Sequence, residues 1–433
     1  MSELFAENMS ILQRRWPALA AQLAALPEAG VDAELVEGQQ STLRIDGIQL
    51  SSRHDRLAEA QVQADSVAQS AAVVHLYGTA LGEVIPLLLA RPALQQLHVH
   101  LLNEALFALL LRLLPMPWLA APQLHLQLAA QSKEIQLPFL ALPAELQLAS
   151  ETNARIRDRL VAEIHLPFVN RRFSADDPQR QARLADNRSG YAADTDVRAL
   201  DGRHAGAELL LLAPGPTLSR HYDRLRQIQC QAGRPVLLCV DTAYLPLRRA
   251  GIRPDYVVSI DYYIHPGILP GDDSHETALI YFPMIDPQVI QGWQGPRFAA
   301  CSASPQYAAL QSTVSRGMLF SRGSVLHPAV DLAVRMGARR ITFLGTDFAF
   351  INHETHAGWP AGLLTPSDMP TDWVVNGHGQ RVSTLLNFRS YLCDLERFIE
   401  CHPEVAFFNG CRDGARIDGA EYDEHWCQGE GHE

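Results

Sequence analysis

The chain has 433 residues, of which 47% are hydrophobic and 19% are charged, values typical of a folded protein with a sizeable core. Because 36 Lys and Arg stand against 48 Asp and Glu, the formal net charge is −12, which argues against nucleic acid or a membrane surface as the main partner. A chain of this length predicts two or three domains.

Lysine is almost absent from the chain, since Lys133 is the only one. A phosphate-binding loop of the GxxxxGK[ST] type needs its own lysine, so that class of site is excluded and any binding of phosphate by side chains falls to arginine. The 7 cysteines are scattered, odd in number and without CxxC spacing, so neither a disulfide framework nor a zinc site is expected.

The first residues, MSELFAENMS, have neither the basic region nor the apolar segment of a signal peptide. The longest apolar run, at residues 105–111, is much shorter than the roughly 18 residues of a membrane-spanning helix. We therefore expect no membrane span and a cytoplasmic location.

Residues 1–150 have the pattern of a small α/β domain. Apolar residues recur with helical spacing between residues 4 and 26, and residues 33–50 alternate as strands do. A strand at 71–76, a helix at 83–89, a strand at 96–101 and a helix at 104–114 then form a βαβ pattern. The spacing Gly78…Gly82 is only part of the dinucleotide-binding pattern GxGxxG, so a close-packed turn is the favoured interpretation.

Residues 151–206 are rich in Arg, Asn, Asp and Gln. Residues 153–164 have a helical pattern, whereas residues 174–201 are polar and show no lasting period. We interpret this region as a polar connector between two domains.

The clearest signal in the chain is the stretch at residues 208–218, ELLLLAPGPTL. Its uninterrupted apolar run predicts a strand buried on both faces, as in a parallel sheet. The run ends at the turn Pro214-Gly215-Pro216-Thr217, and residues 219–231 have a helical pattern. A strand, a tight turn and a helix place free backbone N–H groups at a helix N-terminus, which can bind an anion. The hypothesis is that this turn holds the phosphate of a nucleotide.

Further apolar strands are predicted at 235–240, 255–260, 278–282, 297–301 and 340–344. Polar residues recur where these strands end, at Asp241-Thr242, Asp261, Ser302 and Asp347, and Gly323-Ser324 opens a predicted helix at 325–336. Ligands of open α/β sheets bind at the carboxyl ends of the strands, so we expect a site there. Each aspartate taken singly is more simply explained as a helix N-cap, and the argument rests on the recurrence.

A long loop is predicted after Asp347, at residues 348–372, and it has the length of a lid or binding loop. His356 within it is a candidate general base because imidazole titrates near neutral pH, although a solvated loop histidine explains it as well. His353 and His356 lack companion ligands, so a metal site is the less favoured interpretation.

The chain then continues with an amphipathic helix at 384–401, a last strand at 405–408 and an acidic tail at 421–433 that is predicted to be flexible. The domain with the candidate site therefore spans residues 207–420. The predicted fold class is α/β, with a Rossmann-like central domain, a mostly parallel sheet and a smaller α/β domain before it.

Several of these motifs, in this order, resemble the motility accessory factor family of bacterial flagellin glycosyltransferases. They are the turn at 213–218, VDTAYLPLRRAGIRPDYVVSID at 240–261, GSVLHPAVDLAVRMGARRITFLGTDFAF at 323–350, His356-Ala357-Gly358, GHGQRVSTLLNFRSYLCDLERFI at 377–399 and NGCRDGARIDGA at 409–420. LFAENMSILQRRWPALAAQL and YGTALGEVIPLLL resemble the N-terminal domain of that family. The central domain is also similar to an archaeal hydroxymethylpterin pyrophosphokinase.

The resemblance implies a central domain similar to bacterial sialyltransferases. It implies transfer of a nonulosonic acid, of the pseudaminic or legionaminic type, from a CMP-activated nine-carbon sugar to Ser or Thr of flagellin, in support of flagellum assembly and motility. No cofactor is essential in that scheme, and a divalent metal remains an option. The partners it implies are flagellin and the CMP-sugar, with no nucleic acid.

The family's functional positions fall on residues of this chain. Those assigned to nucleotide binding are Gly215, Pro216, Thr217, Asp241, Thr242, Asp261, Ser302, Gly323 and Ser324. His356 matches the lid histidine that takes the proton of the acceptor hydroxyl, and Asp347 is assigned with it as catalytic. Arg316 and Arg322 precede Gly323-Ser324 closely and are expected to supply local positive charge.

The chain departs from the sialyltransferase pattern at two places. Those enzymes carry Ser-Gly where this chain has Gly323-Ser324, and Asn where it has Asp241 and Asp261. Two alternatives follow: an ATP-dependent pyrophosphokinase acting on a pterin, with Mg²⁺ held by Asp241 or Asp261, and a catalytically inactive flagellin-binding protein.

Overall fold

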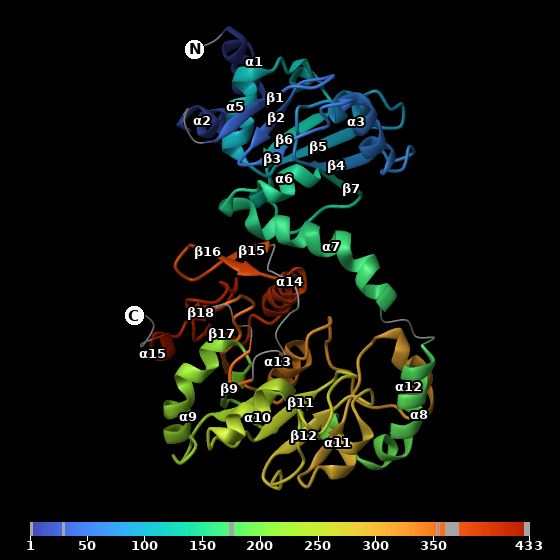
Figure 1. Cartoon of the computed structure of the whole chain (residues 1–433), viewed down its shortest axis with the longest axis vertical. Helices are drawn as coiled ribbons and strands as arrows, with labels where there is room; N and C mark the ends of the chain where they lie inside the picture. Colours follow the sequence, from blue (N-terminus) through green and yellow to red (C-terminus); the bar gives the residue numbers. More distant parts are fainter. Residues whose placement is uncertain are drawn as a thin grey trace. The chain divides into compact units, whose positions relative to one another are not determined.

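The computed structural model describes residues 3–27, 31–172, 177–351, 354, 356–359 and 372–427, with the backbone alone for residues 166–172 (Figure 1). The chain divides into two compact units, Met1–Ile164 and His165–Glu433. The helix α7, Ala154–Arg172, begins in the first unit and continues into the second.

The first unit contains a parallel sheet and a small antiparallel one. Its helices are α1 Glu3–Arg15, α2 Pro17–Ala24, α3 Arg56–Asp65, α4 Val84–Leu89, α5 Glu104–Leu113 and α6 Pro143–Gln147, with 3₁₀ turns η1 Pro117–Ala120, η2 Ala129–Gln131 and η3 Glu151–Asn153. The strands β1 Ala33–Val36, β2 Thr42–Ile45 and β3 Ile48–Gln49 form the antiparallel sheet. The strands β4 Val73–Tyr77, β5 Gln96–Leu101, β6 Leu124–Leu128 and β7 Phe139–Ala141 form the parallel sheet, in the order β6-β5-β4-β7.

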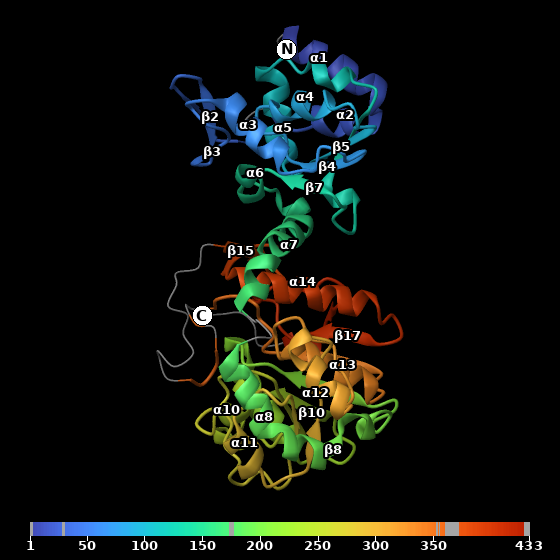
Figure 2. The same cartoon turned by 90° about the vertical axis from the view of Figure 1, so that its right-hand side faces the viewer.

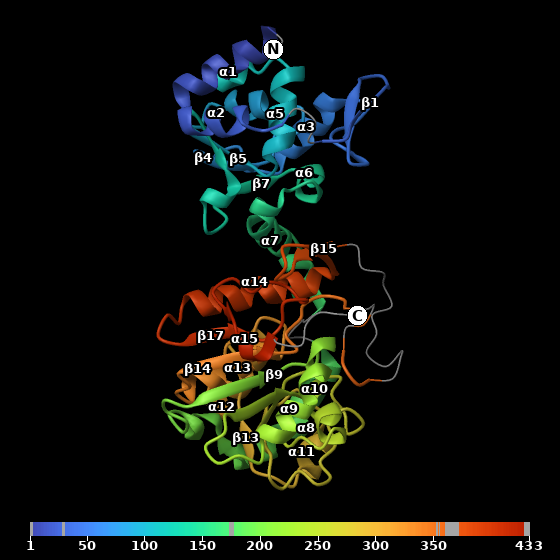
Figure 3. The ribbon, with the colours of Figure 1, turned by 90° about the vertical axis from the view of Figure 1, so that its left-hand side faces the viewer.

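One face of this parallel sheet is apolar because alternate residues of each strand point to the same side. Val74, Leu76, Leu97 and Val99 are fully buried there. The helices α1, α2 and α5 cover that face (Figure 3). The other face carries His75, His98, His100 and His125.

The second unit is built on a nine-stranded sheet in which every pair of neighbouring strands is parallel. Its strands are β8 Thr195–Asp196, β9 Glu208–Leu212, β10 Val236–Val240, β11 Tyr256–Ser259, β12 Ala278–Tyr281, β13 Arg297–Ala299, β14 Arg340–Leu344, β17 Ala406–Asn409 and β18 Glu421–Tyr422. A separate hairpin joins β15 Asp372–Val375 to β16 Arg381–Thr384.

The helices of this unit are α8 Pro178–Ala193, α9 Tyr222–Ile228, α10 Asp241–Arg249, α11 Pro287–Gly292, α12 Ala308–Thr313, α13 Leu326–Arg335, α14 Leu386–Glu400 and α15 Glu424–Cys427, with 3₁₀ turns η4 Val197–Leu200, η5 Pro216–His221 and η6 Pro305–Tyr307. α10 and α13 pack on the central strands, and α13 also packs against α14 (Figure 2).

The strand order β18-β17-β14-β9-β10-β11-β12-β13-β8 contains a reversal of direction. From β9 the chain moves outward through β10 to β13, and it then returns to place β14 on the other side of β9. Such a reversal leaves a crevice at the carboxyl ends of the two central strands. The α/β class and the Rossmann-like parallel sheet expected from the sequence are confirmed.

The structure differs from the expected elements at three places. The stretch interpreted as a connector contains α8, whose buried residues are Leu184, Asn187 and Tyr191, and β8, which is the edge strand of the large sheet. The helix expected at 219–231 is shorter, since a 3₁₀ turn precedes α9. Residues 421–427 are not a free tail, because β18 pairs with β17 and Trp426 is buried; residues 428–433 lie outside the described residues.

Candidate functional site

A cavity of about 270 Å³ lies at the carboxyl ends of β9, β10, β11 and β14, where the strand order reverses. This is the position at which open α/β sheets bind ligands. The cavity is lined by Ala213, Pro214, Gly215, Val240, Asp241, Thr242, Ile260, Asp261, Ile264, Gly323, Ser324, Val325, Leu326, Gly345, Thr346, Asp347, Phe348, Ala349, His356, Phe388 and Tyr391.

Most of the residues singled out from the sequence meet around this cavity. Those that line it are Gly215, Asp241, Thr242, Asp261, Gly323, Ser324, Asp347 and His356. Pro216, Thr217 and Ser302 do not line it: Thr217 is fully buried, and the Ser302 hydroxyl accepts a hydrogen bond from the Ser304 N–H at 3.3 Å. The roles assigned to these residues stay predictions.

The turn after β9 differs from the phosphate-binding turn that was hypothesised. The Gly215 N–H donates to the Gly345 carbonyl at 2.8 Å, and the Thr217 N–H donates to the Asp347 carboxylate at 2.9 Å. Pro214 and Pro216 have no N–H to donate. The turn therefore has no free backbone donor between residues 214 and 217, and the expectation of free N–H groups there was wrong.

Asp347 occupies the place that an anion would take at this turn. Its second carboxylate oxygen accepts a hydrogen bond from the Thr217 hydroxyl at 2.6 Å, and the residue is 2% exposed. A Cβ atom on Gly215 would lie 2.4 Å from both the Asp347 carboxylate and the Gly345 carbonyl, so only glycine fits at this position. These contacts give Asp347 a role in positioning the turn.

Asp241 follows β10 directly and is 2% exposed. One oxygen of its carboxylate accepts a hydrogen bond from the Thr242 N–H at 2.8 Å, and the other accepts one from the Ser259 hydroxyl at 2.9 Å. Burial raises the pKa of Asp241 to about 7, with a smaller contribution from the charge of Asp261. A carboxyl group that titrates near neutral pH in a cavity is suited to exchange protons with a ligand.

His356 is held at the cavity by its neighbours in the chain. The Ala357 N–H donates to the Pro214 carbonyl at 2.7 Å, and the Trp359 indole N–H donates to the Thr242 carbonyl at 2.8 Å. Burial lowers the pKa of His356 to about 4, so its imidazole is neutral at pH 7. His353 and residues 360–371 of the same predicted loop lie outside the described residues.

The remaining wall of the cavity includes aromatic residues that the sequence reasoning missed. Phe388 and Tyr391 come from α14, and a Cβ atom on Gly323 would lie 3.0 Å from the Tyr391 ring. Gly323 also has a φ of +92°, which other residues rarely adopt. The helix itself was predicted, but its sequence does not tell which turn of it meets the strand ends.

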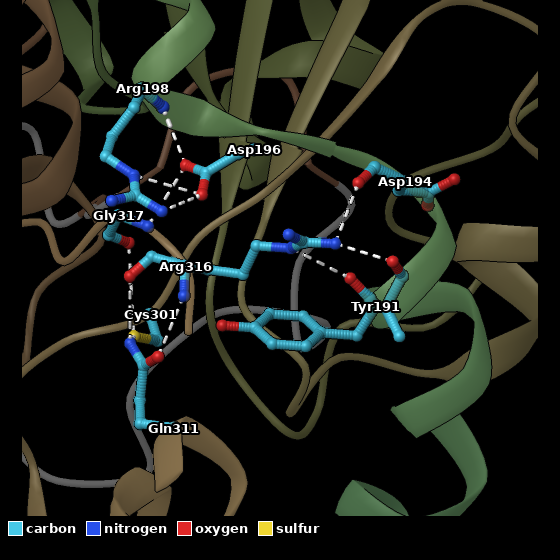
Figure 4. Close-up of polar contacts among 9 residues, drawn as sticks. Tyr191, Asp194, Asp196, Arg198, Cys301, Gln311, Arg316 and Gly317 are labelled. Carbon is cyan, nitrogen blue, oxygen red and sulfur yellow. Dashed lines mark hydrogen bonds and ion pairs between the residues drawn. The ribbon is translucent and has the colours of Figure 1, made fainter. Parts of the chain in front are cut away.

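Neither of the arginines expected to supply positive charge lines the cavity. The Arg316 guanidinium donates to the carbonyls of Tyr191, Ala192 and Asp194, at 3.2, 2.6 and 3.3 Å, and so satisfies the C-terminal end of α8 (Figure 4). Arg322 lines a different groove. Within the described part of the chain the cavity has no arginine or lysine in its lining, and its charged side chains are Asp241, Asp261 and Asp347.

The described residues contain neither a cluster of metal ligands nor a membrane-spanning helix. No group of three or more His, Cys, Asp or Glu side chains there is arranged to hold a metal ion. No helix in this part of the chain combines the length and the apolar composition needed to cross a membrane.

Comparisons with known proteins agree with the resemblance seen in the sequence. Residues 183–353 match the family model described as MptE-like, 6-hydroxymethylpterin diphosphokinase MptE-like. Among solved structures, the chain is similar to the MAf glycosyltransferase from Magnetospirillum magneticum AMB-1, with 16% identity and a TM-score of 0.44, over 97% of this chain and 74% of that one. No curated protein matches the chain. The similarity of the central domain to a hydroxymethylpterin pyrophosphokinase, expected from the sequence, is confirmed.

Proposed function

We propose that the second unit is a glycosyltransferase that moves a nonulosonic acid, of the pseudaminic or legionaminic type, from a CMP-activated donor to Ser or Thr of flagellin in the cytoplasm. The proposal rests on the order of the motifs along the chain, from the turn at 213–218 to NGCRDGARIDGA at 409–420. Residues 183–353 match the family model described as 6-hydroxymethylpterin diphosphokinase MptE-like, in agreement with the similarity of the central domain noted from the sequence.

The observation that carries the proposal is the cavity at the reversal of strand order. It brings Asp241 and Asp261 from two strand ends together with Ser324 from the start of α13 and His356 from the loop after β14. Its volume of about 270 Å³ is close to the lower end of the range for small-molecule sites. The aromatic wall of Phe388 and Tyr391 suits a flat base or a sugar face.

The reaction exchanges one bond at the anomeric carbon of the sugar. The bond to the CMP phosphate oxygen breaks, and CMP leaves with the electron pair. The bond to the acceptor oxygen forms, and the hydroxyl proton passes to a base. The transition state resembles an oxocarbenium ion, as in glycoside hydrolysis. The protein then needs to orient donor and acceptor, contact the departing phosphate and supply the base.

The phosphate contacts in this scheme come from outside the turn at 214–217. That turn directs both of its backbone N–H groups into the protein. Ser324 and Thr242 line the cavity and carry neutral hydroxyl groups. Both were assigned to nucleotide binding from the sequence, so we propose that they contact the phosphate. Binding by neutral donors fits a monophosphate leaving group better than a chain of phosphates, because the lining is acidic.

Two residues qualify as the base that accepts the hydroxyl proton. His356 is neutral at pH 7, and a neutral imidazole can accept a proton, but a pKa of about 4 makes it a weak base. Asp241 has a pKa of about 7, which matches the operating pH of a general base. We assign the proton transfer to Asp241 first and keep His356, the residue favoured by the resemblance, as the alternative.

The scheme has no step that needs a metal or an organic cofactor. The leaving group is already activated as CMP, and its charge can be met by hydrogen bonds from the protein. We therefore propose that the CMP-sugar is the only small molecule required.

One observation favours a second candidate, a pyrophosphokinase that uses ATP and Mg²⁺. Asp241 and Asp261 follow neighbouring parallel strands, and the charge of Asp261 contributes to the raised pKa of Asp241, so the two carboxyl groups lie close together. Carboxylates with waters are the usual protein ligands of Mg²⁺. The family model that matches residues 183–353 describes a diphosphokinase.

Thermal unfolding with ligands separates the two candidates. CMP is expected to raise the melting temperature in the absence of a divalent metal, because ligand binding to the folded state stabilises it. Stabilisation by ATP with Mg²⁺ but not by CMP would replace the glycosyltransferase by the pyrophosphokinase. CMP binding is then measured for the Asp241→Asn and His356→Ala variants. A variant that still binds CMP has kept the folded structure of the site.

Intact mass spectrometry of flagellin separates an enzyme from an inactive flagellin-binding protein. Cells with the wild-type protein are expected to yield flagellin heavier by whole nonulosonic acid units than cells without it. The Asp241→Asn variant should yield unmodified flagellin, while Thr313→Val, a change in an exposed residue that does not line the cavity, should leave the mass shift intact. Equal flagellin masses with and without the protein would exclude catalysis.

A further inference from the structure

A second groove, of about 490 Å³, lies on the second unit and shares no lining residue with the cavity. It is formed by the segment before α13, by α13 and by the C-terminal half of α14. The groove is lined by Ala303, Met318, Leu319, Phe320, Arg322, Asp331, Arg335, Asp394, Arg397, Phe398, Cys401 and His402.

The groove is the reverse of the cavity in its charge, since it contains three arginines. Asp331 is already neutralised: its carboxylate accepts from the Phe320 N–H at 2.7 Å and from Arg335 at 2.9 Å. Asp394 lies 3.6 Å from Arg397. The net charge of the groove lining is +1, from the three arginines Arg322, Arg335 and Arg397 and the two aspartates. The net charge of the whole chain is −12.

Arg322 carries that unbalanced charge. The residue is exposed, and among the residues that the structure describes its guanidinium has no hydrogen-bond or ion-pair partner. An arginine guanidinium presents a planar set of donors that matches a carboxylate with two parallel hydrogen bonds. Arg322 is therefore available for a carboxylate from outside the chain.

The floor of the groove is a stack of rings. Phe320 and Phe398 are stacked with ring centroids 5.2 Å apart, and Phe398 and His402 are stacked at 4.1 Å. Met318 is 51% exposed at the edge. A groove with ring faces below and guanidinium groups beside them can take a segment that alternates acidic and apolar side chains.

The groove and the cavity are consecutive along two elements. Arg322 in the groove is followed by Gly323 and Ser324 in the cavity. On α14, Phe388 and Tyr391 line the cavity, and Asp394 and Arg397 line the groove. Each step of three residues turns about 60° around a helix of 3.6 residues per turn, so the lining passes around α14 from the cavity to the groove. A chain bound in the groove would thus lead toward the cavity.

We propose that this groove docks an acidic segment of the protein that accepts the sugar, and so presents its hydroxyl to the cavity. The proposal rests on the proposed transfer to a protein. The occupant is a polypeptide with carboxylates because Arg322 matches a carboxylate in shape and charge, and because the ring stack suits apolar side chains between the carboxylates.

The test is the anisotropy of a short fluorescein-labelled peptide in which Glu alternates with Ser and Leu, titrated with the full chain. The control peptide has Gln in place of every Glu. The acidic peptide is expected to bind more tightly, with an affinity that falls as salt is raised. Arg322→Gln should weaken it about tenfold, as expected for loss of one charge-assisted contact. Met318→Glu should weaken it by repulsion.

Arg339→Gln is the matched control, because Arg339 is exposed and lies outside the groove. It should bind the peptide as the wild type does. Equal binding of the Gln peptide, or unchanged binding by both Arg322→Gln and Met318→Glu, would overturn the proposal. So would tighter binding of a single-stranded oligonucleotide that competes with the peptide and is lost in Arg322→Gln.

Thermal unfolding with CMP, measured on the same variants, keeps this inference apart from the proposed function. CMP is expected to stabilise Arg322→Gln as much as the wild type, since Arg322 does not line the cavity. Stabilisation by CMP without peptide binding would contradict the docking proposal and leave the proposed transfer reaction standing. Peptide binding without any stabilisation by CMP would support the docking surface and contradict the proposal of CMP-dependent transfer.

Discussion

The carboxylate of Asp347 binds Thr217 at two atoms, accepting from its N–H at 2.9 Å and from its hydroxyl at 2.6 Å. Asp347 lies just after β14 and Thr217 just after β9, so the contact joins the two central strands at the point where the strand order reverses. Thr217 is fully buried and Asp347 is 2% exposed. The pair therefore fixes the turn that forms one edge of the cavity.

Thr217→Val should destabilise the second unit by about 1–3 kcal/mol, because it removes the hydroxyl donor and leaves a carboxylate oxygen of Asp347 buried without it. The change keeps the shape of the side chain, so no cavity is created. Chemical denaturation gives the free energy of unfolding, and CMP binding should weaken at the same time because the turn is no longer held.

Thr313→Val is the control for this substitution, since Thr313 lies at the exposed end of α12 and its hydroxyl donates only to the nearby Leu310 carbonyl. We expect it to change the free energy of unfolding by less than about 0.5 kcal/mol. If both variants lose the same stability, the buried contact with Asp347 is not what holds the turn.

Asp241→Asn should remove a pH dependence of both activity and stability. Burial raises the pKa of Asp241 to about 7, above the unfolded value of about 3.9. The folded state then holds one more proton than the unfolded state between about pH 4 and pH 7, so this group contributes stability at low pH that is lost as pH rises through 7. Transfer activity should rise over the same range as the base form appears.

The measurement is a pair of pH series, one of the free energy of unfolding and one of sugar transfer. For Asp241→Asn we expect the fall in stability between pH 5 and pH 8 to be smaller than in the wild type, and the residual activity to lose its rise near pH 7. A rise near pH 7 that persists in Asp241→Asn and disappears in His356→Ala would assign the base to His356.

The strands of the second unit were predicted well because they are buried on both faces. Their apolar runs are continuous, as at residues 236–240 and 256–259, and each is followed by a polar residue at the same edge of the sheet. That is why the sequence alone brought Asp241, Asp261 and Asp347 together. These apolar runs predict strands but not the order of the strands in the sheet, so the contact of Asp347 with Thr217 could not be predicted.

The helix α8 was missed for a different physical reason. Its buried face is narrow and includes Asn187, whose amide donates to the carbonyls of Pro283 and Ile285 at 2.9 and 2.8 Å. A buried asparagine interrupts the apolar pattern by which a helix is recognised in a sequence. It can be buried because its amide is hydrogen-bonded inside the protein, and the sequence does not reveal those partners. Arg316 was misplaced similarly, since nearness in sequence to Gly323 does not say which way a long side chain turns.

Glu145 fills the turn after β4 in the first unit, as Asp347 does in the second. Its buried carboxylate accepts hydrogen bonds from the Thr79 and Ala80 N–H groups, both at 2.5 Å, and a Cβ atom on Gly78 would lie 2.8 Å from that carboxylate group. The close-packed turn favoured from the sequence agrees with these contacts. The donors that would meet a dinucleotide phosphate are already used.

Glu145→Ala should therefore destabilise the first unit, because each of the two N–H groups left unpaired costs about 1–3 kcal/mol. Amide hydrogen exchange at residues 78–82 should speed up strongly in this variant and less in Glu145→Gln, which keeps one acceptor oxygen. Glu37→Ala, in an exposed position, should leave the exchange unchanged. Protection of residues 78–82 by added CMP or NAD in the wild type would contradict this account.

The last prediction concerns the polar face of the first parallel sheet. There His75, His98 and His125 stack across β4, β5 and β6 with ring centroids 4.8 and 4.6 Å apart. His100 is 1% exposed, its ring lies 3.0 Å from the His75 ring nitrogen, and it accepts from the Gln127 amide at 3.1 Å. Burial lowers the pKa of His100 to about 3 and that of His75 to about 4.

These histidines should make the first unit sensitive to acid. The folded pKa values of His75 and His100 lie below the unfolded value of about 6.5, so the unfolded state binds more protons, and stability falls as pH drops below 6.5. Protection factors of the β4 and β5 amides should thus decrease between pH 7 and pH 5, and His100→Gln should show a smaller decrease. His54→Gln, at an exposed position, should behave as the wild type. An unchanged decrease in His100→Gln would show that the buried imidazole is not its cause.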